Sequence, residues 1–363
     1  MTTALIQDDA TLRAACDRWA QSAWLCLDTE FVRVDTYHAR LCLLQVSDGV
    51  TAACVDPLAP LDLNPLLDLI YAPSRIKVLH APGQDLEILV RLRGHCPQPL
   101  FDSQTAATLL GIGDQIGYAG LIEKRLGIVL DKSLSRTDWA RRPLREAELA
   151  YAVADVSHLA TIYAQLQDEL AAAGRLAWLA EDCARLCEPA QYQTRPEDAW
   201  ERLKGLARMN PREQTVAAAL ADWREREAQA RDRPRKWILE DDAIYRMAER
   251  RPATLGELEA LRVLPPKTLE RHGERLLAVV AQASAAPEHL YARDEEFDAA
   301  QKQKLKQLQD LVQARASTLN LPASFLAARA DLVALVRAGA LAQSKVLRGW
   351  RREVCGEALL LQV

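Results

Sequence analysis

The chain has 363 residues, of which 49% are hydrophobic and 26% charged, with 15 Gly, 17 Pro and a formal net charge of -4. These values are typical of a globular protein of two or three domains and exclude disordered, collagen-like and low-complexity chains. No apolar run approaches the roughly 20 residues that span a bilayer, and residues 1–10 lack the pattern of a signal peptide. The eight Cys form no Cys-x-x-Cys pair, which favours free thiols in a reducing compartment, so we expect a cytoplasmic protein.

The first half of the chain alternates strand-like and helix-like patterns. Short apolar runs bounded by turn residues predict four strands, at residues 23–27, 40–47, 51–55 and 76–80. Apolar residues at helical spacing predict three helices, at residues 84–92, 120–126 and 144–170. A hairpin followed by strand–helix units predicts an α/β domain with a mixed sheet.

The second half is rich in Ala and Leu and predicts helices almost throughout. A break in the helical rhythm between Cys187 and Trp200 indicates a linker between domains. Residues 212–231 predict one helix, and Thr254-Leu255-Gly256-Glu257 has the form of a capping box that opens another. After a second break near Pro287, residues 297–319 and 323–337 predict a last helical block.

Two sets of carboxylates follow predicted strands. Asp28 and Glu30 come after the first strand, and residues i and i+2 of a strand point to the same face. Two carboxylates that close together repel each other unless a cation lies between them, and oxygen ligands favour Mg²⁺ or Mn²⁺. Asp85 opens the helix after the fourth strand, where site residues are common in α/β folds. Taken alone, Asp85 is better explained as a charge that stabilises the helix N-terminus.

A third candidate lies on the long helix at residues 144–170. Tyr151 and Asp155 are four residues apart and therefore lie on one face of it. Asp155 stands among apolar residues, so its carboxylate either faces solvent or meets a metal ion or a donor. Among the eight Tyr of the chain, only Tyr151 has an Asp four residues later, which favours a shared role for the pair.

These three elements, in this order, resemble the three exonuclease motifs of the DEDD superfamily of 3′-to-5′ exonucleases, in its tyrosine-type branch. More closely, the chain is similar to the ribonuclease D family. In the first half the likeness covers Asp28–Glu30, His80–Asp85, Phe101–Ala106, Leu130–Ser133, Ser135–Trp139 and Tyr151–Asp155. In the second half, Pro211–Arg226, Pro234–Leu239, Pro252–Leu264 and His272–Gly273 resemble the HRDC domain of RecQ helicases and ribonuclease D, and Leu326–Leu332 and Gly349–Arg351 resemble a divergent second HRDC-like domain.

The resemblance implies a fold and a domain order. We expect an α/β ribonuclease H-like exonuclease domain with a mixed sheet over residues 1–185 and a linker over 186–208. Two all-α HRDC-type helical domains are expected to follow, over 209–289 and 290–363. The family expectation is a monomer with no membrane segment.

The resemblance also implies the residues of a two-metal site. Asp28, Glu30 and Asp155 would bind one divalent ion, Mg²⁺ or Mn²⁺. Asp28 would bridge to a second ion, which Asp85 would support through water. Tyr151 would orient the attacking water, because the position of the His in the histidine-type branch is occupied by Ala150. The implied reaction is metal-dependent 3′-to-5′ hydrolysis of RNA to nucleoside 5′-monophosphates, trimming the 3′ ends of tRNA precursors and other structured RNAs.

The remaining candidates are weaker. His80 and His158 are interpreted as structural residues, since Mg²⁺ prefers oxygen ligands. One segment could contact RNA through phosphates and base stacking; it contains Arg231, Arg233, Arg235, Lys236 and Trp237. The alternative, which we favour on sequence alone, is a solvated loop with a Trp in the core. Two other functions stay open: a DNA exonuclease with the same metal chemistry, and a non-catalytic adaptor that holds nucleic acid through its HRDC modules.

Overall fold

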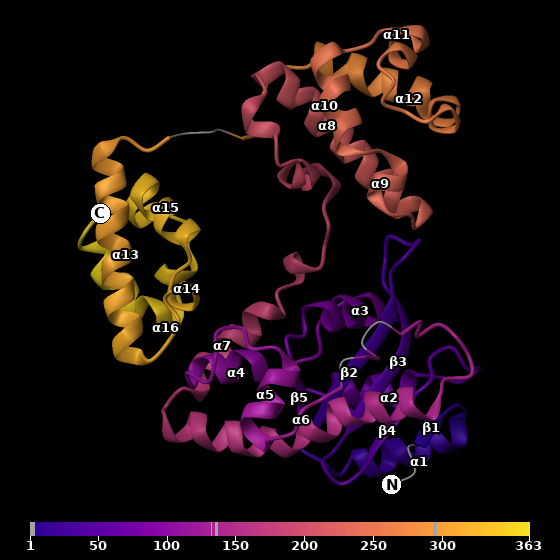
Figure 1. The fold of residues 1–363 in the computed structure, drawn as a ribbon, viewed down its shortest axis with the longest axis vertical. Helices are drawn as coiled ribbons and strands as arrows, with labels where there is room; N and C mark the ends of the chain where they lie inside the picture. The colour runs from indigo at the N-terminus through magenta and orange to yellow at the C-terminus, as the bar shows by residue number, and fades with distance from the viewer. Residues whose placement is uncertain (1–3, 132, 135–136, 293–295) are drawn as a thin grey trace. The chain divides into compact units, whose positions relative to one another are not determined.

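The computed structural model describes residues 4–131, 133–134, 137–292 and 296–363 (Figure 1). By the contacts within the chain, these residues divide into two compact units. Unit 1 takes the residues up to Val32, Leu41–Tyr192 and Phe297–Val363, and unit 2 takes Arg33–Arg40 and Gln193–Glu296. Two segments of unit 2 therefore interrupt unit 1 in the sequence. The first is a short segment between two strands, and the second begins after Tyr192. Three residues of the motif segments named above, Lys132, Ser135 and Arg136, lie outside the described residues.

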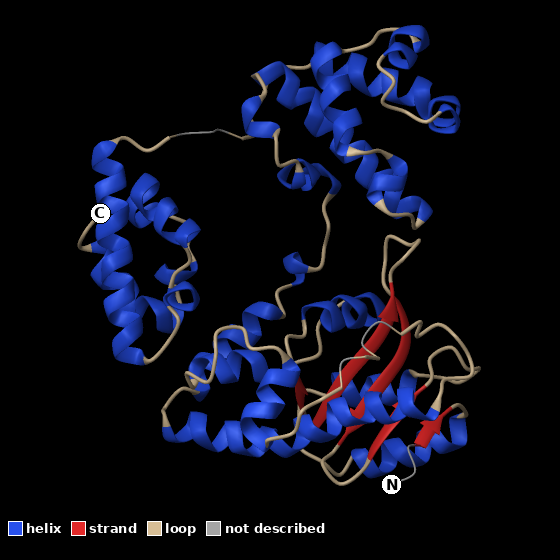
Figure 2. Ribbon diagram, viewed as in Figure 1, coloured by secondary structure: helices blue, strands red, loops and turns tan. Residues whose placement is uncertain are grey.

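A six-stranded mixed sheet forms the centre of unit 1 (Figure 2). Its order is β1-β4-β3-β2-β5-β6, and the strands are β1 (Ala4–Ile6), β2 (Trp24–Val32), β3 (Arg40–Ser47), β4 (Ala52–Val55), β5 (Ile76–Leu79) and β6 (Leu100–Asp102). Strand β1 pairs in parallel with β4, and β2 and β6 each pair in parallel with β5, whereas β3 and β4 are antiparallel. The mixed sheet and the four predicted strands are confirmed.

Strand β2 is longer than the sequence pattern indicated. We expected the strand to end at Leu27, but it continues to Val32. The added residues include Thr29, Phe31 and Val32, whose branched or aromatic side chains favour extended backbone. Asp28 and Glu30 therefore lie inside the strand, not after it, and the alternation of the strand directs both to one face.

Seven helices of the described residues follow or connect these strands in unit 1. They are α1 (Asp9–Trp19), α2 (Asn64–Tyr71), α3 (Gly83–Arg93), α4 (Ser103–Leu109), α5 (Tyr118–Leu126), α6 (Glu146–Ala172) and α7 (Leu176–Leu186). Helix α6 buries Val156 and Leu159 in the same core as Leu25 and Leu27 of β2. This packing holds the helix against the strand that carries Asp28. The three helices predicted in this half are confirmed.

The C-terminal block is helical, as predicted, and packs in unit 1. It comprises α13 (Ala299–Leu319), α14 (Ala323–Leu326), α15 (Arg329–Ala338), α16 (Gly349–Arg351) and α17 (Glu357–Leu360), with short turns η4 (Gly339–Leu341), η5 (Lys345–Leu347) and η6 (Arg352–Gly356). Trp350 stacks on Trp178 of α7 with ring centroids 4.4 Å apart. Arg351 donates to both carboxylate oxygens of Asp182, at 2.5 and 3.0 Å, and both side chains are buried.

Unit 2 contains the other helical region. Its elements are η2 (Pro196–Arg202), η3 (Leu206–Arg208), α8 (Pro211–Arg231), α9 (Arg235–Ile238), α10 (Asp241–Arg250), α11 (Leu255–Ala260) and α12 (Pro266–Ala285), and η1 (Pro189–Gln191) precedes them in unit 1. Leu220, Ile244 and Leu276 belong to its core. Thr254 caps α11 as predicted, accepting from the Glu257 N–H at 3.2 Å. The Glu257 carboxylate accepts from Ala253, one residue before the cap, so only half of the capping box forms.

Two further sequence expectations concern the thiols and membranes. All eight Cys are buried and free. Among the described residues, no helix combines the length and the apolar character needed to cross a bilayer.

Candidate active site

Strand β2 and helix α6 bring three carboxylates together in unit 1. Asp28 and Glu30 of β2 and Asp155 of α6 each offer an oxygen, and these atoms lie within 4.8 Å of one another. Asp85, the third residue of α3, lines the same cavity of about 290 Å³, as does Tyr151, one helical turn before Asp155. The cavity therefore contains all five residues that the sequence motifs singled out.

Asp85 does more than charge the start of α3. Its side chain is only 8% exposed, and it accepts a hydrogen bond of 2.5 Å from the Thr29 hydroxyl. The N-cap of α3 is Pro82, and the preceding residue, Ala81, has a positive φ of 51°. The Ala81 N–H donates to Asp102 at 2.9 Å, which fixes this turn beside the cavity that Ala81 lines.

Replacing Thr29 with Val is expected to weaken the metal site without emptying it. The change removes the hydroxyl that stabilises the charged form of Asp85, so the pKa of Asp85 should rise further. Loss of such a supporting hydrogen bond costs about 10–100-fold in metal affinity or activity. A titration of activity against Mg²⁺ measures the shift, and Thr29→Ser, which keeps the hydroxyl, serves as the control. An unchanged Mg²⁺ midpoint in Thr29→Val would contradict this role.

The four carboxyls are poorly hydrated and repel one another. Burial, with the charges of Asp155 and Asp85, raises the pKa of Glu30 to about 8. Burial also raises the pKa of Asp155 to about 7 and that of Asp85 to about 6, against the hydrogen bonds from Tyr151 and Thr29. The pKa of Asp28 rises well above its ordinary value through burial and then through the charges of Asp85, Asp155 and Glu30. A divalent cation would relieve this repulsion.

The donor set fits a hard cation. The group consists of carboxylate oxygens alone, which are the ligands that Mg²⁺ and Mn²⁺ prefer. His80 lines the cavity, but its ring nitrogens already contact the Ser103 hydroxyl at 2.9 Å and the Ile116 carbonyl at 3.1 Å. His158 is not among the residues that line the cavity. Both histidines are therefore better explained as structural residues.

Tyr118 is a cavity residue that sequence reasoning missed. Its hydroxyl donates to the backbone carbonyl of Asp155, and its ring meets the edge of His80 with centroids 5.5 Å apart. Tyr118 thus ties the first residue of α5 to the part of α6 that carries Asp155. On the other side, Tyr151 stacks on Trp139 with centroids 6.3 Å apart. No local pattern signals these contacts, because the partners come from separate elements.

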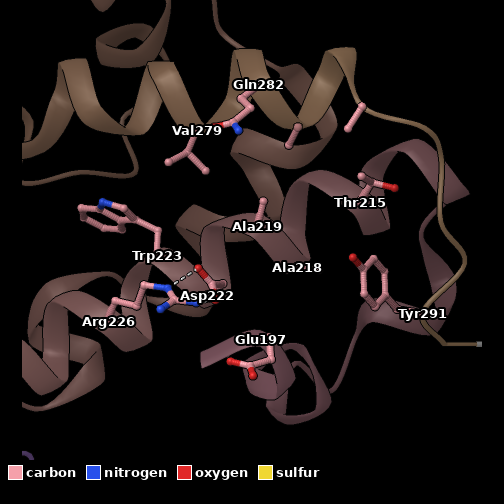
Figure 3. Close-up of a pocket in the computed structure, with 12 residues that line it drawn as sticks. Glu197, Thr215, Ala218, Ala219, Asp222, Trp223, Arg226, Val279, Gln282 and Tyr291 are labelled. Carbon is pink, nitrogen blue, oxygen red and sulfur yellow. Dashed lines mark hydrogen bonds and ion pairs between the residues drawn. The ribbon is translucent and has the colours of Figure 1, made fainter. Parts of the chain in front are cut away.

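A larger cavity, of about 450 Å³, lies in unit 2 between η2, α8 and α12 (Figure 3). Its walls are mostly small or apolar, and Asp222 forms an ion pair with Arg226 at 2.8 Å (Figure 3). Within the described part of the chain, only Asp28, Glu30 and Asp155 form a group of three metal-ligating side chains. The smaller cavity of unit 1 is therefore the better candidate for catalysis.

The predicted RNA-contact segment lies in unit 2, where α8 ends and α9 begins. Arg231 pairs with Glu227, Arg233 with Asp35 at 3.2 Å, and Arg235 with Glu225 at 2.5 and 2.7 Å. Lys236 is exposed, and Trp237 is 60% exposed. The interpretation of Trp237 as a core residue is therefore wrong.

Comparisons with known proteins show which families the chain resembles. The 3′-5′ exonuclease family model matches residues 3–171, and the HRDC domain model matches residues 213–280. Ribonuclease D of Sphingobium indicum is 40% identical over 364 residues, covering 97% of this chain and 92% of that protein. Ribonuclease D of Pseudomonas paraeruginosa is 37% identical over 363 residues, covering 98% and 96%. The crystal structure of Escherichia coli RNase D, described as an exoribonuclease involved in structured RNA processing, matches with a TM-score of 0.91 at 34% identity, covering 100% of this chain and 99% of that one.

Proposed function

Because the chain belongs to the ribonuclease D family, we propose that it is a metal-dependent 3′-to-5′ exoribonuclease that releases nucleoside 5′-monophosphates. The observation that carries the proposal is the convergence of Asp28, Glu30 and Asp155, with Asp85 and Tyr151 in the same cavity. We propose 3′-extended tRNA precursors and other structured RNAs as substrates, supported by the description of the Escherichia coli relative.

We assign roles to the site residues from their positions and from the chemistry of their side chains. Asp28, Glu30 and Asp155 would hold one divalent ion. Asp28 would also contact a second ion, which Asp85 would support through water. When bound, the ions lower the pKa of the attacking water and neutralise charge on the leaving 3′ oxygen. The low hydration of the site strengthens each of these interactions. The protein itself supplies the spacing of the carboxylates and the group that orients the water.

Tyr151 is the proposed orienting group. Its hydroxyl donates to the Asp155 carboxylate. Burial and the charges of Asp155, Glu30 and Asp28 raise its pKa, so the phenol keeps its proton at neutral pH. The hydroxyl oxygen can therefore accept a hydrogen bond from a water molecule while its proton stays directed to Asp155.

Replacing Tyr151 with Phe is expected to lower kcat on RNA by about 10–100-fold and to leave KM nearly unchanged. The ring and its stacking on Trp139 remain, so the variant loses only the hydroxyl, with its hydrogen bond to Asp155 and its contact to the water. Single-turnover digestion of a labelled oligoribonucleotide measures the effect. Tyr71→Phe is the matched control, because it removes a hydroxyl that bonds the Leu89 carbonyl outside the cavity. Equal kcat values for both variants would contradict the assignment.

Two alternatives make different predictions. A non-catalytic adaptor has no use for a repulsive carboxylate cluster, and it should bind no Mg²⁺ or Mn²⁺ at Asp28, Glu30 and Asp155. Isothermal calorimetry with Mn²⁺ on the wild type and on Glu30→Gln distinguishes the adaptor from the proposed enzyme. Our proposal requires that the wild type binds Mn²⁺ and that the variant binds it more weakly. A DNA exonuclease would bind the metal equally well, so the choice between RNA and DNA needs the digestion described in the Discussion.

We further propose that the protein acts as a monomer in the cytoplasm. The eight free, buried thiols support a reducing compartment. Light scattering after size-exclusion chromatography tests the oligomeric state, and a mass well above the 40.4 kDa of one chain would contradict it.

A further inference from the structure

A large aromatic side chain lies on the surface of unit 2. Trp237 of α9 is 60% exposed, whereas the two residues after it, Ile238 and Leu239, are 6% and 2% exposed. The short helix is therefore anchored by its aliphatic residues and not by the indole. A surface indole has a flat apolar face that is available for stacking, and its surroundings indicate which kind of partner it suits.

Positive side chains flank the indole. The Arg233 guanidinium carbon lies 6.0 Å from the ring centroid, and the Arg233 side chain is 48% exposed. Lys236, the residue before Trp237, is exposed and forms no ion pair among the residues that the structure describes. One nitrogen of Arg233 contacts Asp35, but a guanidinium has five N–H donors, so others remain for a ligand. An exposed indole face beside two cations suits single-stranded nucleic acid, because a base can stack on the indole while the phosphates meet the cations.

The other two cations of the segment are already committed. Arg235 forms a bidentate pair with Glu225, a fully buried carboxylate, and Arg231 pairs with Glu227. The five residues predicted to contact RNA therefore divide into two groups. Arg233 and Lys236 flank the exposed indole of Trp237, whereas the guanidinium groups of Arg231 and Arg235 pair with carboxylates of α8.

The segment Arg33–Arg40, also part of unit 2, supports this arrangement. The Tyr37 hydroxyl accepts from Arg235 at 2.8 Å and donates to Glu225, and the Arg235 guanidinium carbon lies 4.6 Å from the centroid of the Tyr37 ring. Asp232 accepts from the N–H groups of Tyr37 and His38, at 3.1 and 3.0 Å. Asp232 is the C-cap of α8, so these bonds hold the turn from which Arg233 and α9 project.

We propose that Trp237, Lys236 and Arg233 form a stacking platform for single-stranded RNA, and that Tyr37 is a positioning residue that holds the platform in place. The proposal rests on the proposed exoribonuclease function, which makes RNA the occupant. One base stacks on the indole while the two cations meet the flanking phosphates. Because every base has an aromatic face, binding at the platform is tolerant of sequence.

Affinity for a fluorescein-labelled single-stranded 12-nucleotide RNA tests the platform. The full chain is used in an Asp28→Asn background with Mg²⁺, so that the RNA is not consumed. Trp237→Ala should weaken binding about tenfold, and Trp237→Phe should retain most of the affinity. Lys236→Ala should weaken binding. It should also reduce the slope of log affinity against log salt concentration by about one. Lys267→Ala, which removes an exposed cation on α12, is the matched control and should change nothing.

The positioning role of Tyr37 is tested by kinetics with Asp28 intact. Tyr37→Ala should raise KM for the 12-nucleotide RNA and leave kcat unchanged, with recovery of most of the affinity in Tyr37→Phe, which keeps the ring over Arg235. A merely structural role would lower kcat or the unfolding temperature instead.

Equal RNA affinity for Trp237→Ala and the wild type would overturn the proposal that these residues bind RNA. The surface would then suit another class of partner, such as a protein. That result leaves the proposed function intact as long as the wild type still shortens RNA. Failure of the wild type to shorten RNA with Mg²⁺ would instead overturn the proposed function, whatever the affinities of the variants.

Discussion

Replacing Asp28 with Asn is expected to lower kcat on RNA by more than about 10³-fold while the protein stays folded. Burial and the charges of Asp85, Asp155 and Glu30 all raise the pKa of Asp28. We therefore propose Asp28 as the residue that would contact both ions. Asn has the same shape but offers one neutral carbonyl oxygen, so the ions lose a charged ligand that their chemistry requires.

Single-turnover digestion measures this loss, and circular dichroism with thermal unfolding checks the fold. The metal-free variant should unfold at a higher temperature than the wild type, because one of the repelling charges is gone. Asp17→Asn is the matched control, since Asp17 is exposed on α1 and remote from the cavity. More than a tenth of the wild-type kcat in Asp28→Asn would contradict the proposed metal site.

The second large effect is the pH dependence of stability without metal. The folded-state pKa values of Glu30, Asp155 and Asp85, about 8, 7 and 6, lie above those of the unfolded chain. Between about pH 4 and pH 8 these three carboxyls therefore bind more protons in the folded protein than in the unfolded one. This contribution to stability is present at low pH and is lost as the pH rises through the folded-state values, at about 1.4 kcal/mol per pH unit for each extra proton.

Urea unfolding at pH 6 and pH 8, in EDTA and in Mg²⁺, tests whether stability falls as the pH rises. In EDTA the free energy of unfolding should fall between pH 6 and pH 8, and the fall should be smaller in Glu30→Gln, which cannot ionise at that position. Mg²⁺ at 100 times its dissociation constant should restore about 2.7 kcal/mol at pH 8. A wild type that gains stability from pH 6 to pH 8 in EDTA, in parallel with Glu30→Gln, would contradict the account.

Local spacing predicted the parts of the site that depend on one element at a time. The strand alternation put Asp28 and Glu30 on one face, and the helical repeat put Tyr151 beside Asp155. The resemblance to known motifs added that these pairs meet, which no spacing within either element could indicate. The strand boundary was less accurate, because the end at Leu27 was inferred from loss of apolar residues, whereas β2 continues through its two acidic positions.

Contacts between distant segments were beyond the reach of sequence patterns. The Thr29–Asp85 hydrogen bond joins residues 56 positions apart, and Tyr118 reaches Asp155 across 37. The exposure of Trp237 also depends on tertiary structure, because the next two residues, Ile238 and Leu239, are buried in place of the indole. Each of these features depends on packing between elements, which local propensity and periodicity do not predict.

The most direct test of the central claim is a digestion time course with Mg²⁺. It uses a 5′-labelled single-stranded RNA, the same sequence as DNA, and a 3′-extended tRNA precursor, with EDTA and Asp28→Asn as controls. The account predicts a ladder of single-nucleotide steps on the RNA and the precursor, faint on DNA, and absent in EDTA and in the variant. Binding of RNA without any ladder, or an equal ladder in Asp28→Asn, would contradict it, and equal ladders on DNA would contradict the choice of RNA as substrate.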